Sequence, residues 1–560
     1  MSRFKQTTLY LVLVLLTALM LIGINGVEKQ MDKQVKEYRL RFTGDIKNAS
    51  PLVSFTTMAL GSFRGIVADM LWLRAESLKQ DGKYFELIQL GRWIVDLQPN
   101  FTGATAYLAW NMAYNISVTC TDHAERWKWV NEGIKLIRDQ ALEYNPDDPD
   151  LYYELAWIYK HKVGDVMDDA NMYYKTRLAL EMREIMGENF PDWKALAEVP
   201  ADLKELEKVY PADHEVWRQI KAAGYPDIDA LYKQFSQAAP AALPAELAAK
   251  LTDDKVRRDF YDYLRCRLLR DRLKLDPREI VEIENTYGKL DWRVPESFAI
   301  YWAARGNRRA PNGRSIKCDR IIAQSLYTAF KSGRLLMIDP DTFEGVQIAP
   351  NLDLVDAVDR TFADANEYYT KLAGGERGGS TFRTARINFL KEAVTLLYNY
   401  GKFAKAKEYF AKLIKEDGPK PNLETFILNE WSRQVKQADV KTANAIISGL
   451  IYQSVYYLLY DEMDAALAQE RLAQAVYRNY MREFGDSERT RLAPYQNTKR
   501  NVVDNCLRTL PPLLAQMLRA RITSEQVETE QQQKFTSPSM SGLPGSSSIP
   551  ALPTDGKDDK

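Results

Sequence analysis

The stretch that decides the fold runs from Leu71 to Pro99 and reads LWLRAESLKQDGKYFELIQLGRWIVDLQP. Apolar residues recur at three and four spacing on both sides of Asp81-Gly82-Lys83, which is typical of two amphipathic helices joined by a tight turn. Pro99 ends the second pattern, because proline has no N–H and cannot continue a helix. The stretch therefore predicts a pair of antiparallel helices.

The same helical pattern continues along most of the 560 residues, with Pro and Gly between segments and few alternating strand patterns. The 46% of hydrophobic and 11% of aromatic residues exceed what disordered chains carry, so the chain is expected to fold. The helical pattern predicts that the fold is all-α. It has 76 Lys and Arg against 76 Asp and Glu, and this balance disfavours nucleic acid as a partner.

Residues 71–99 resemble a tetratricopeptide repeat, in which large and small apolar residues make each helix pack into its neighbour. Leu87 stands where the family favours alanine, and Gly91 where it favours an aromatic residue. The residues that carry the resemblance are Leu71, Ala75, Leu78, Gly82, Tyr84, Ile94 and Pro99.

Three further units resemble the same repeat. One ends at Pro146, and because Pro99 and Pro146 lie farther apart than the family's repeat of about 34 residues, an insertion is expected in the loop 117–123. The resemblance extends over residues 71–175 and 386–418, and it implies an α-solenoid. The alternative is a set of ordinary helical hairpins without a common superhelix. The other two units are marked by Tyr152, Leu155, Ala156 and Tyr159, and by Leu390, Ala393, Val394, Leu397, Gly401, Phe403, Ala406, Phe410 and Leu413.

The N-terminus carries 20 consecutive uncharged residues, Thr7 to Gly26, which as a helix would reach about 30 Å and span a bilayer. Arg3 and Lys5 precede this run, so a single-pass anchor is expected with a cytoplasmic N-terminus and a periplasmic or extracellular body. The alternative is a signal peptide that is cleaved near Ile24-Asn25-Gly26, leaving a secreted protein.

Composition and breaks divide the chain into six expected parts. The last is rich in Gln, Ser, Pro and Gly and is expected to be disordered. The parts are an anchor or signal (1–27), a stalk (28–60), N-terminal repeats (61–185), a helical middle module with a small hairpin at 334–348 (186–379), a C-terminal repeat region (380–520) and a tail (521–560).

In the resembled family, the first helix of each hairpin forms a concave surface that binds a protein or peptide. By register, the resemblance nominates eight residues for this surface, and their aromatic and mixed-charge character suits an extended peptide. We therefore expect a membrane-anchored scaffold or adaptor without a cofactor. The nominated residues are Asp69, Trp72, Glu76, Tyr153, Trp157, His161, Tyr398 and Asn399.

No catalytic or metal-binding motif is found, because the chain has only three histidines and no Cys-x-x-Cys pair. Two other functions stay open: an envelope enzyme or glycan-processing factor using Asp262 with Glu282 or Glu284, and a structural spacer in a homo-oligomeric assembly. The amides of Asn111 and Asn115, four residues apart, are expected to pair internally. The local basic run could meet an acidic partner or form a solvated helix end; it comprises Arg305, Arg308, Arg309, Arg314, Lys317 and Arg320.

Overall fold

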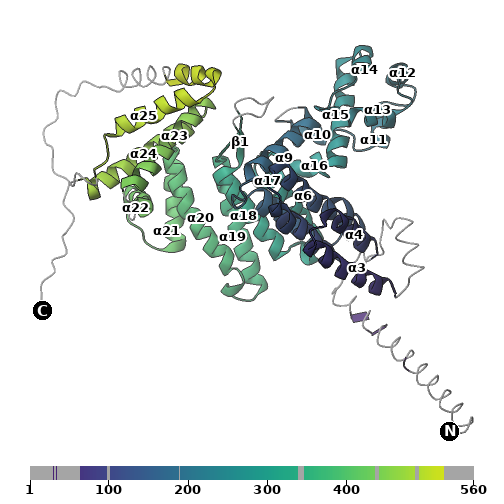
Figure 1. The fold of residues 1–560 in the computed structure, drawn as a ribbon, viewed down its shortest axis with the longest axis horizontal. Coiled ribbons are helices and arrows are strands. Elements are labelled where there is room, and N and C mark those ends of the chain that lie inside the picture. The colour runs from purple at the N-terminus through teal and green to yellow at the C-terminus, as the bar shows by residue number, and fades with distance from the viewer. Residues whose placement is uncertain are drawn as a thin grey trace, which may run out of the picture. The chain divides into compact units, whose positions relative to one another are not determined.

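The computed structural model describes residues 63–97, 101–187, 190–337, 346–435, 440–485 and 491–522, and the single positions 20, 29, 30, 33 and 34. The described chain is almost entirely helical (Figure 1), which confirms the expected all-α class. It divides into two compact units, Met1–Ala393 and Val394–Lys560, and the division falls inside helix α20 (Ser380–Asn399).

The first hairpin consists of α3 (Phe63–Gln80) and α4 (Tyr84–Leu97), which pack on each other. Gly82 occupies the turn with a φ of 72°, a left-handed conformation that glycine adopts without strain. A Cβ atom on Gly91 of α4 would lie 3.3 Å from Leu108 of the next helix, so a small residue suits this close approach.

The second hairpin has two unusually long helices. Its first helix runs through α5 (Thr102–Trp110), the π-helical turn η1 (Asn111–Ile116) and the 3-10 turn η2 (Ser117–Thr119). Its second helix runs through α6 (His123–Lys135), the π-helical turn η3 (Leu136–Ala141) and α7 (Leu142–Tyr144). The prediction of an inserted loop at 117–123 is wrong, because the added residues lengthen the helices and leave only a short turn at 120–122.

The third hairpin pairs α8 (Pro149–Trp157), continued by the π-helical turn η4 (Ile158–Val163), with α9 (Asn171–Met186). Asp148 caps α8 by accepting a hydrogen bond from the backbone N–H of Asp150, and Pro149 fits the first turn, where no intrahelical N–H donor is needed. Gly187 ends α9 in the left-handed conformation with a φ of 74°.

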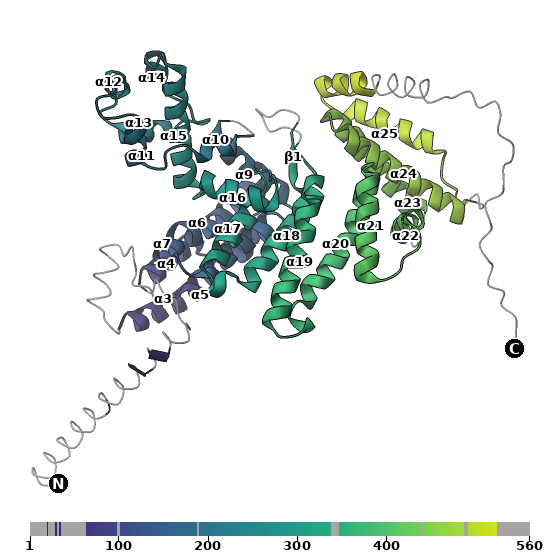
Figure 2. The same ribbon diagram turned by 180° about the vertical axis from the view of Figure 1, so that it is seen from behind.

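The chain then leaves the stack of hairpins for about a hundred residues. The short helices α11 to α14 gather around the N-terminal half of α15, where Tyr210 and Trp217 contact Phe260 (Figure 2). The helices of this segment are α10 (Trp193–Ala197), α11 (Leu203–Val209), α12 (Glu215–Ala222), α13 (Ile228–Phe235), α14 (Ala245–Lys250), α15 (Asp254–Arg272) and α16 (Pro277–Tyr287).

Helix α17 (Pro295–Arg309) returns to the stack, since it packs along α8 and η4 of the third hairpin and along the following helix, α18 (Ile316–Ser332). Ring contacts mark this interface: Tyr159 stacks on Phe298 with centroids 5.1 Å apart, and Tyr152 on Trp302 at 6.2 Å. Helices α8, α17 and α18 therefore pack against one another, although more than a hundred residues separate α8 from α17. A 3-10 turn, η5 (Pro311–Gly313), joins α17 to α18.

Two short strands, β1 (Arg334–Leu336) and β2 (Gln347–Ala349), pair antiparallel where the sequence indicates a hairpin. A buried ion pair holds β1 in place. Asp291 accepts the N–H of Leu335, and Arg293 donates to the C=O of Leu335, while their charged groups lie 2.7 Å apart. The unit continues with η6 (Leu352–Leu354), α19 (Val355–Leu372), which packs on α18, and η7 (Glu376–Gly378).

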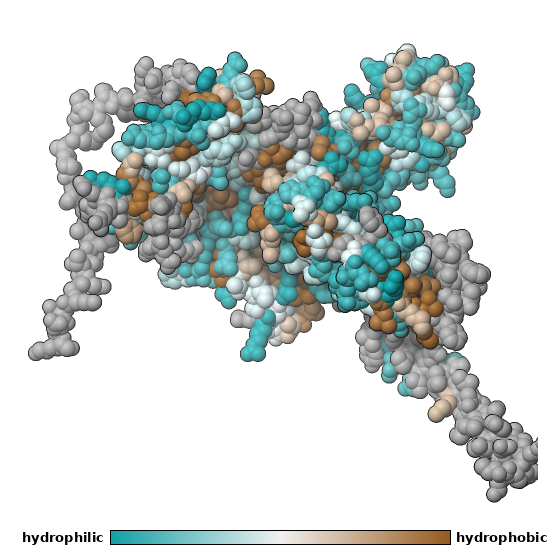
Figure 3. Space-filling view, viewed as in Figure 1, coloured by the Kyte–Doolittle hydropathy of each residue, from teal (hydrophilic) through white to brown (hydrophobic). Residues whose placement is uncertain are grey.

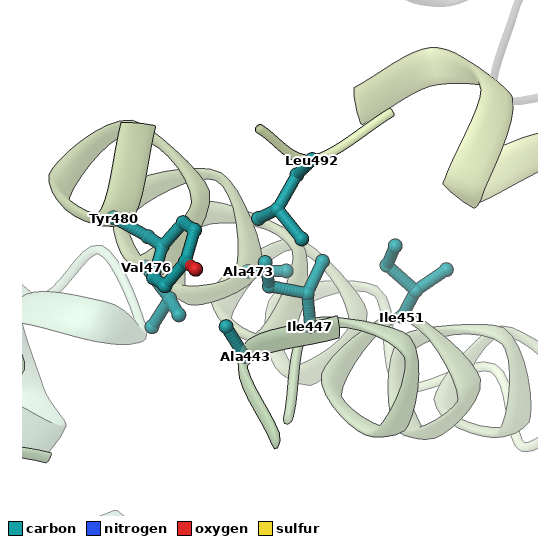
Figure 4. Close-up of a cluster of buried hydrophobic side chains, with 7 residues drawn as sticks. All are labelled: Ala443, Ile447, Ile451, Ala473, Val476, Tyr480 and Leu492. Carbon is teal, nitrogen blue, oxygen red and sulfur yellow. The ribbon is translucent and has the colours of Figure 1, made fainter. Parts of the chain in front are cut away.

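The second unit is built around a hairpin of α23 (Val440–Leu459) and α24 (Met463–Phe484), against which α25 (Tyr495–Thr509) and α22 (Leu423–Val435) pack. Its core holds small and large apolar residues from both helices of the hairpin (Figure 4): Ala443, Ile447, Ile451, Ala473, Val476 and Tyr480, with Leu492. Helix α21 (Phe403–Asp417) precedes these helices in the chain. It is flanked by two glycines with positive φ, Gly401 at 71° and Gly418 at 79°.

Several expectations fall outside the described residues. The apolar run Thr7–Gly26 is not described apart from Met20, and neither is most of the stalk or the tail beyond residue 522. Among the helices that the structure does describe, none combines the length and the apolar character required to cross a bilayer. The anchor and the domain boundaries at 185 and 379 stay predictions.

Candidate functional site

The first helices of the second and third hairpins carry a continuous series of aromatic rings, which we call the aromatic ladder: Trp110, Tyr114, His161, Trp157 and Tyr153. Trp110 stacks on Tyr114 with ring centroids 4.8 Å apart, and Tyr114 lies 5.6 Å from His161. His161 lies flat on Trp157, 4.9 Å away with 11° between the planes, and Tyr153 follows at 6.3 Å. The hydroxyl of Tyr114 also lies 3.2 Å from Nδ1 of His161.

Two π-helical turns bring these rings together. Tyr114 belongs to η1 and His161 to η4, and these two turns lie next to each other. A π-turn fits one more residue into a helix than an α-turn does, so it shifts the side chains that follow onto another face. Each turn therefore aims its ring at the neighbouring hairpin.

The amides of Asn111 and Asn115 are used within η1. Asn115 Nδ2 donates to Asn111 Oδ1 at 2.6 Å, and Asn111 Nδ2 donates to the C=O of Tyr107 at 3.0 Å. The expectation of internal pairing is confirmed. These bonds hold the widened turn together on the side where Asn111 is buried.

A smaller aromatic contact continues the series towards the first hairpin. Trp72 of α3 lies 5.3 Å from Tyr107 of α5. Lys79, which pairs with Glu76 at 3.5 Å, lies over the Tyr107 ring. The hollow between these helices holds only about 10 Å³, so it is a dimple on the surface and too small for a ligand. Its lining includes Trp72, Glu76, Lys79, Tyr107 and Asn111.

Lysines flank the aromatic ladder. Lys160 lies 5.4 Å from the centroid of Trp157, Lys162 5.6 Å from Tyr114, and Lys317 of α18 5.4 Å from Tyr153. Burial lowers the pKa of His161 below its usual value, an effect that Lys160 and Lys162 reinforce and Asp165 opposes. The histidine is therefore neutral at pH 7, and the charge along the ladder comes from the lysines.

A buried ion pair fixes the turn that follows η4. Asp168 accepts hydrogen bonds from Lys162 at 2.5 Å, from the hydroxyl of Tyr174 at 3.1 Å and from Arg126 of the second hairpin at 3.2 Å. Arg126 also pairs with Asp169. This network ties α6, η4 and α9 together, so it sets the position of Lys162 beside the ladder.

The structure brings together part of the nominated surface. Tyr153, Trp157 and His161 form one side of the aromatic ladder. Trp72 and Glu76 lie beside the dimple on α3, and Asp69 is exposed on the same helix. The nominated pair Tyr398 and Asn399 belongs to the other compact unit, where Asn399 is buried. Partner binding by these residues stays a prediction.

Sequence reasoning missed three rings of this surface, Tyr107, Trp110 and Tyr114. Their spacing of three and four residues places them on one helical face, and this signal was available in the sequence. The residues that the resemblance nominates come from the other units, so these three rings are not among the expected surface residues.

The carboxylates of the enzyme alternative have separate partners. Asp262 pairs with Arg265 at 2.9 Å, and Glu284 accepts a hydrogen bond from the indole of Trp292 at 2.9 Å. Glu282 lies 3.6 Å from Arg308. Each of these three carboxylates therefore has its own polar partner on another residue.

The four cysteines are free thiols. Cys266 packs near the C=O of Leu196, and Cys318 near that of Pro149. Within the residues that the structure describes, no group of His, Cys, Asp and Glu side chains is placed to hold a metal ion.

Comparison with known sequences supports the repeat. The tetratricopeptide repeat family matches residues 139–169, which cover the end of the second hairpin and the first helix of the third. Neither the curated proteins nor the solved structures gave a match. The matched segment contains Tyr153, Trp157 and His161, so the family match and one side of the aromatic ladder coincide.

Proposed function

We propose that this chain, a partial tetratricopeptide-repeat protein, is a scaffold that binds a protein partner through the aromatic ladder. Tetratricopeptide repeats in general serve protein–protein interaction, and the match at 139–169 supports that role here. The observation that carries the proposal is the unbroken contact of rings from Trp110 to Tyr153 across two hairpins.

The partner that fits best is an extended peptide segment with apolar and acidic side chains. Tyrosine and tryptophan offer large contact areas with little loss of side-chain entropy, and they dominate the binding energy of many interfaces. Lys160 and Lys317 lie beside the rings and would meet acidic groups of the peptide.

The location we propose is the cell envelope, with the body outside the cytoplasm. Support comes from the sequence: the apolar run Thr7–Gly26 follows the basic residues Arg3 and Lys5. External protease added to spheroplasts should digest the body, and full protection would exclude this orientation. A body released without its first residues would indicate signal cleavage instead of an anchor.

The scaffold is tested by crosslinking in native membranes followed by mass spectrometry. A photoreactive residue is placed at Trp110, which is exposed, and capture is compared between the otherwise unchanged protein and Trp157→Ala. We expect Trp157→Ala to reduce the capture of a defined partner. Trp93→Ala is the matched control, because Trp93 is an exposed tryptophan of α4 outside the aromatic ladder. Equal capture in both variants would refute the proposal.

A homo-oligomeric spacer is the second candidate, and one observation favours it. Ile66, Met70 and Leu73 are exposed on α3 at four and three spacing, and Figure 3 shows brown, apolar residues in the region of this helix. Exposed apolar stripes of this kind mark interfaces. Sedimentation of the purified protein would decide: an oligomer that Met70→Glu dissociates would support the spacer, and a monomer would exclude it.

A further inference from the structure

We infer that a second, separate site binds a small oxyanion in a pocket between the second hairpin and α17. The pocket has a volume of about 360 Å³, within the range of small-molecule sites. Its walls come from η3 and α7, the start of α8, the second residue after α15 and the last turns of α17. Its lining includes Arg138, Tyr152, Lys274, Trp302, Arg305 and Arg309.

Three buried N–H groups of the lining residues lack an acceptor among the described residues. They are Nε1 of Trp302 and the Nε atoms of Arg305 and Arg309. Trp302 is 1% exposed, so its indole N–H has left water without gaining a hydrogen bond. Leaving a buried donor unsatisfied is unfavourable by about 1–3 kcal/mol, and native proteins rarely do so without a ligand or water.

These groups form one connected cluster. The guanidinium of Arg305 lies 5.4 Å from the Trp302 ring, that of Arg309 lies 5.1 Å from the Tyr152 ring, and the two rings lie 6.2 Å apart. The three residues that carry the unsatisfied donors therefore line one pocket and are linked through the Tyr152 and Trp302 rings. All three unsatisfied groups are donors and none is an acceptor, which is the complement of an oxyanion.

The charge of the residues that line the pocket also favours an anionic ligand. Four cationic side chains face two carboxylates, Asp139 and Glu143. Asp139 is already occupied by Arg138, whose Nε and Nη2 bind it at 2.6 and 2.8 Å. Arg305 shares Glu279 with Arg308. In the described part of the chain, Arg309 and Lys274 form no ion pair with a carboxylate, so their charges remain for a ligand.

The ligand chemistry is that of a compact oxyanion, a phosphate or a carboxylate group, carried on a body small enough for the pocket. Arginine binds both groups through directed N–H donors, and Lys274 adds a point charge. The rings of Tyr152 and Trp302 offer an apolar wall for the body of the ligand. This site uses α17 and the second hairpin, so it does not depend on the aromatic ladder or on the proposed function.

The test is isothermal titration of the full chain in detergent micelles with inorganic phosphate and, separately, with succinate, at an ionic strength matched with sodium chloride. We expect saturable binding of at least one. Phosphate binding alone would identify a phosphate site, and succinate binding alone a carboxylate site. Absence of saturable binding by either would overturn the inference.

Arg309→Met should weaken binding about ten-fold or more, because it removes one charge-assisted donor group but keeps a long apolar stem. Arg320→Met is the matched control, since Arg320 is an exposed arginine of α18 that contacts Thr381 outside the pocket. The affinity of this variant for the anion should equal that of the unmodified chain. Equal affinity in Arg309→Met and the unmodified chain would contradict the site.

Lys274→Asn covers the case in which Arg309→Met does not fold. Lys274 has a φ of 57°, and asparagine tolerates this left-handed conformation better than most residues. The variant removes the positive charge and shortens the side chain, and it should weaken binding several-fold. An unchanged affinity would then count against the site.

Discussion

The ammonium group of Lys162 lies 2.5 Å from the carboxylate of Asp168, and both side chains are buried at the junction of the second and third hairpins. Burial alone would raise the pKa of Asp168, but the hydrogen bonds from Lys162, Ala170 and Tyr174 lower it to about 2. The carboxylate of Asp168 therefore stays ionised at neutral pH, and its removal should be felt across two hairpins.

Asp168→Asn should lower the free energy of unfolding by about 3 kcal/mol at pH 7, because it leaves the buried ammonium of Lys162 without a counter-charge. Urea unfolding followed by circular dichroism measures the change. Asp169→Asn is the control: Asp169 is exposed and also pairs with Arg126, so its loss should change stability by about 1 kcal/mol or less. An equal loss of unfolding free energy in the two variants would show that the buried pair of Lys162 and Asp168 stabilises the fold no more than the exposed pair of Arg126 and Asp169.

The pH dependence follows from the sign of the Asp168 shift. Its folded pKa is lower than its unfolded pKa, so the unfolded state binds more protons in acid. The stabilisation is complete above about pH 4, the unfolded value, and is lost as the pH falls towards about 2. Unfolding curves of Asp168→Asn should lack this acid-side slope.

Glu296 should give the opposite slope. It begins α17 next to the third hairpin, and burial raises its pKa to about 7, although Lys175 and Lys160 act to lower it. The folded state therefore binds more protons than the unfolded state between the two pKa values, and stability should fall as the pH rises from about 4.5 to 7. Glu296→Gln, which keeps the shape of the neutral acid, should remove this slope. A slope that persists in the variant would assign it to another group.

Gly133 of α6 lies where the two helices of the second hairpin pack closely. A Cβ atom there would lie 2.6 Å from the backbone oxygen of Ala109. Gly133→Ala should therefore destabilise the protein by about 1–3 kcal/mol through overpacking. Gly103→Ala, at an open position in the first turn of α5, should instead be neutral or stabilising by up to about 1 kcal/mol. Thermal unfolding compares the two, and a stabilising Gly133→Ala would contradict the packing described.

The stack of His161 on Trp157 can be followed by NMR, because only three histidines contribute imidazole signals. The pKa of His161 should lie below the usual value of about 6.5, and Trp157→Ala should raise it by exposing the ring to water. Trp93→Ala should leave it unchanged. A normal His161 pKa in the unmodified chain would mean that the ring is not buried against the indole.

Much of the fold could be predicted from sequence, because hairpins are local. The turn glycine Gly82 and the apolar spacing around it specify α3 and α4 without reference to the rest of the chain. The contact of Trp157 with His161 was equally accessible, since residues four apart on a helix share a face.

The remainder depends on contacts between distant parts of the chain. Nothing local indicates that Phe298 stacks on Tyr159, so the return of α17 to the stack could not be predicted from spacing. The same holds for the pocket beside Trp302 and Arg309. The spacing of Trp110 and Tyr114 indicates a shared helical face, but the orientation of Tyr114 towards His161 depends on a π-turn, and an α-helical periodicity of 3.6 residues does not describe one.

The turns η1 and η4 also make the arrangement of the aromatic ladder sensitive to the insertion or deletion of a single residue. Deleting one residue from Asn111–Ile116 would restore regular α-helix and rotate everything on one side of the deletion by about 100° relative to the other. Tyr114 would then turn away from His161 while the hairpin itself could still form. A lineage could in this way gain or lose a recognition surface without altering the amino acids that compose it.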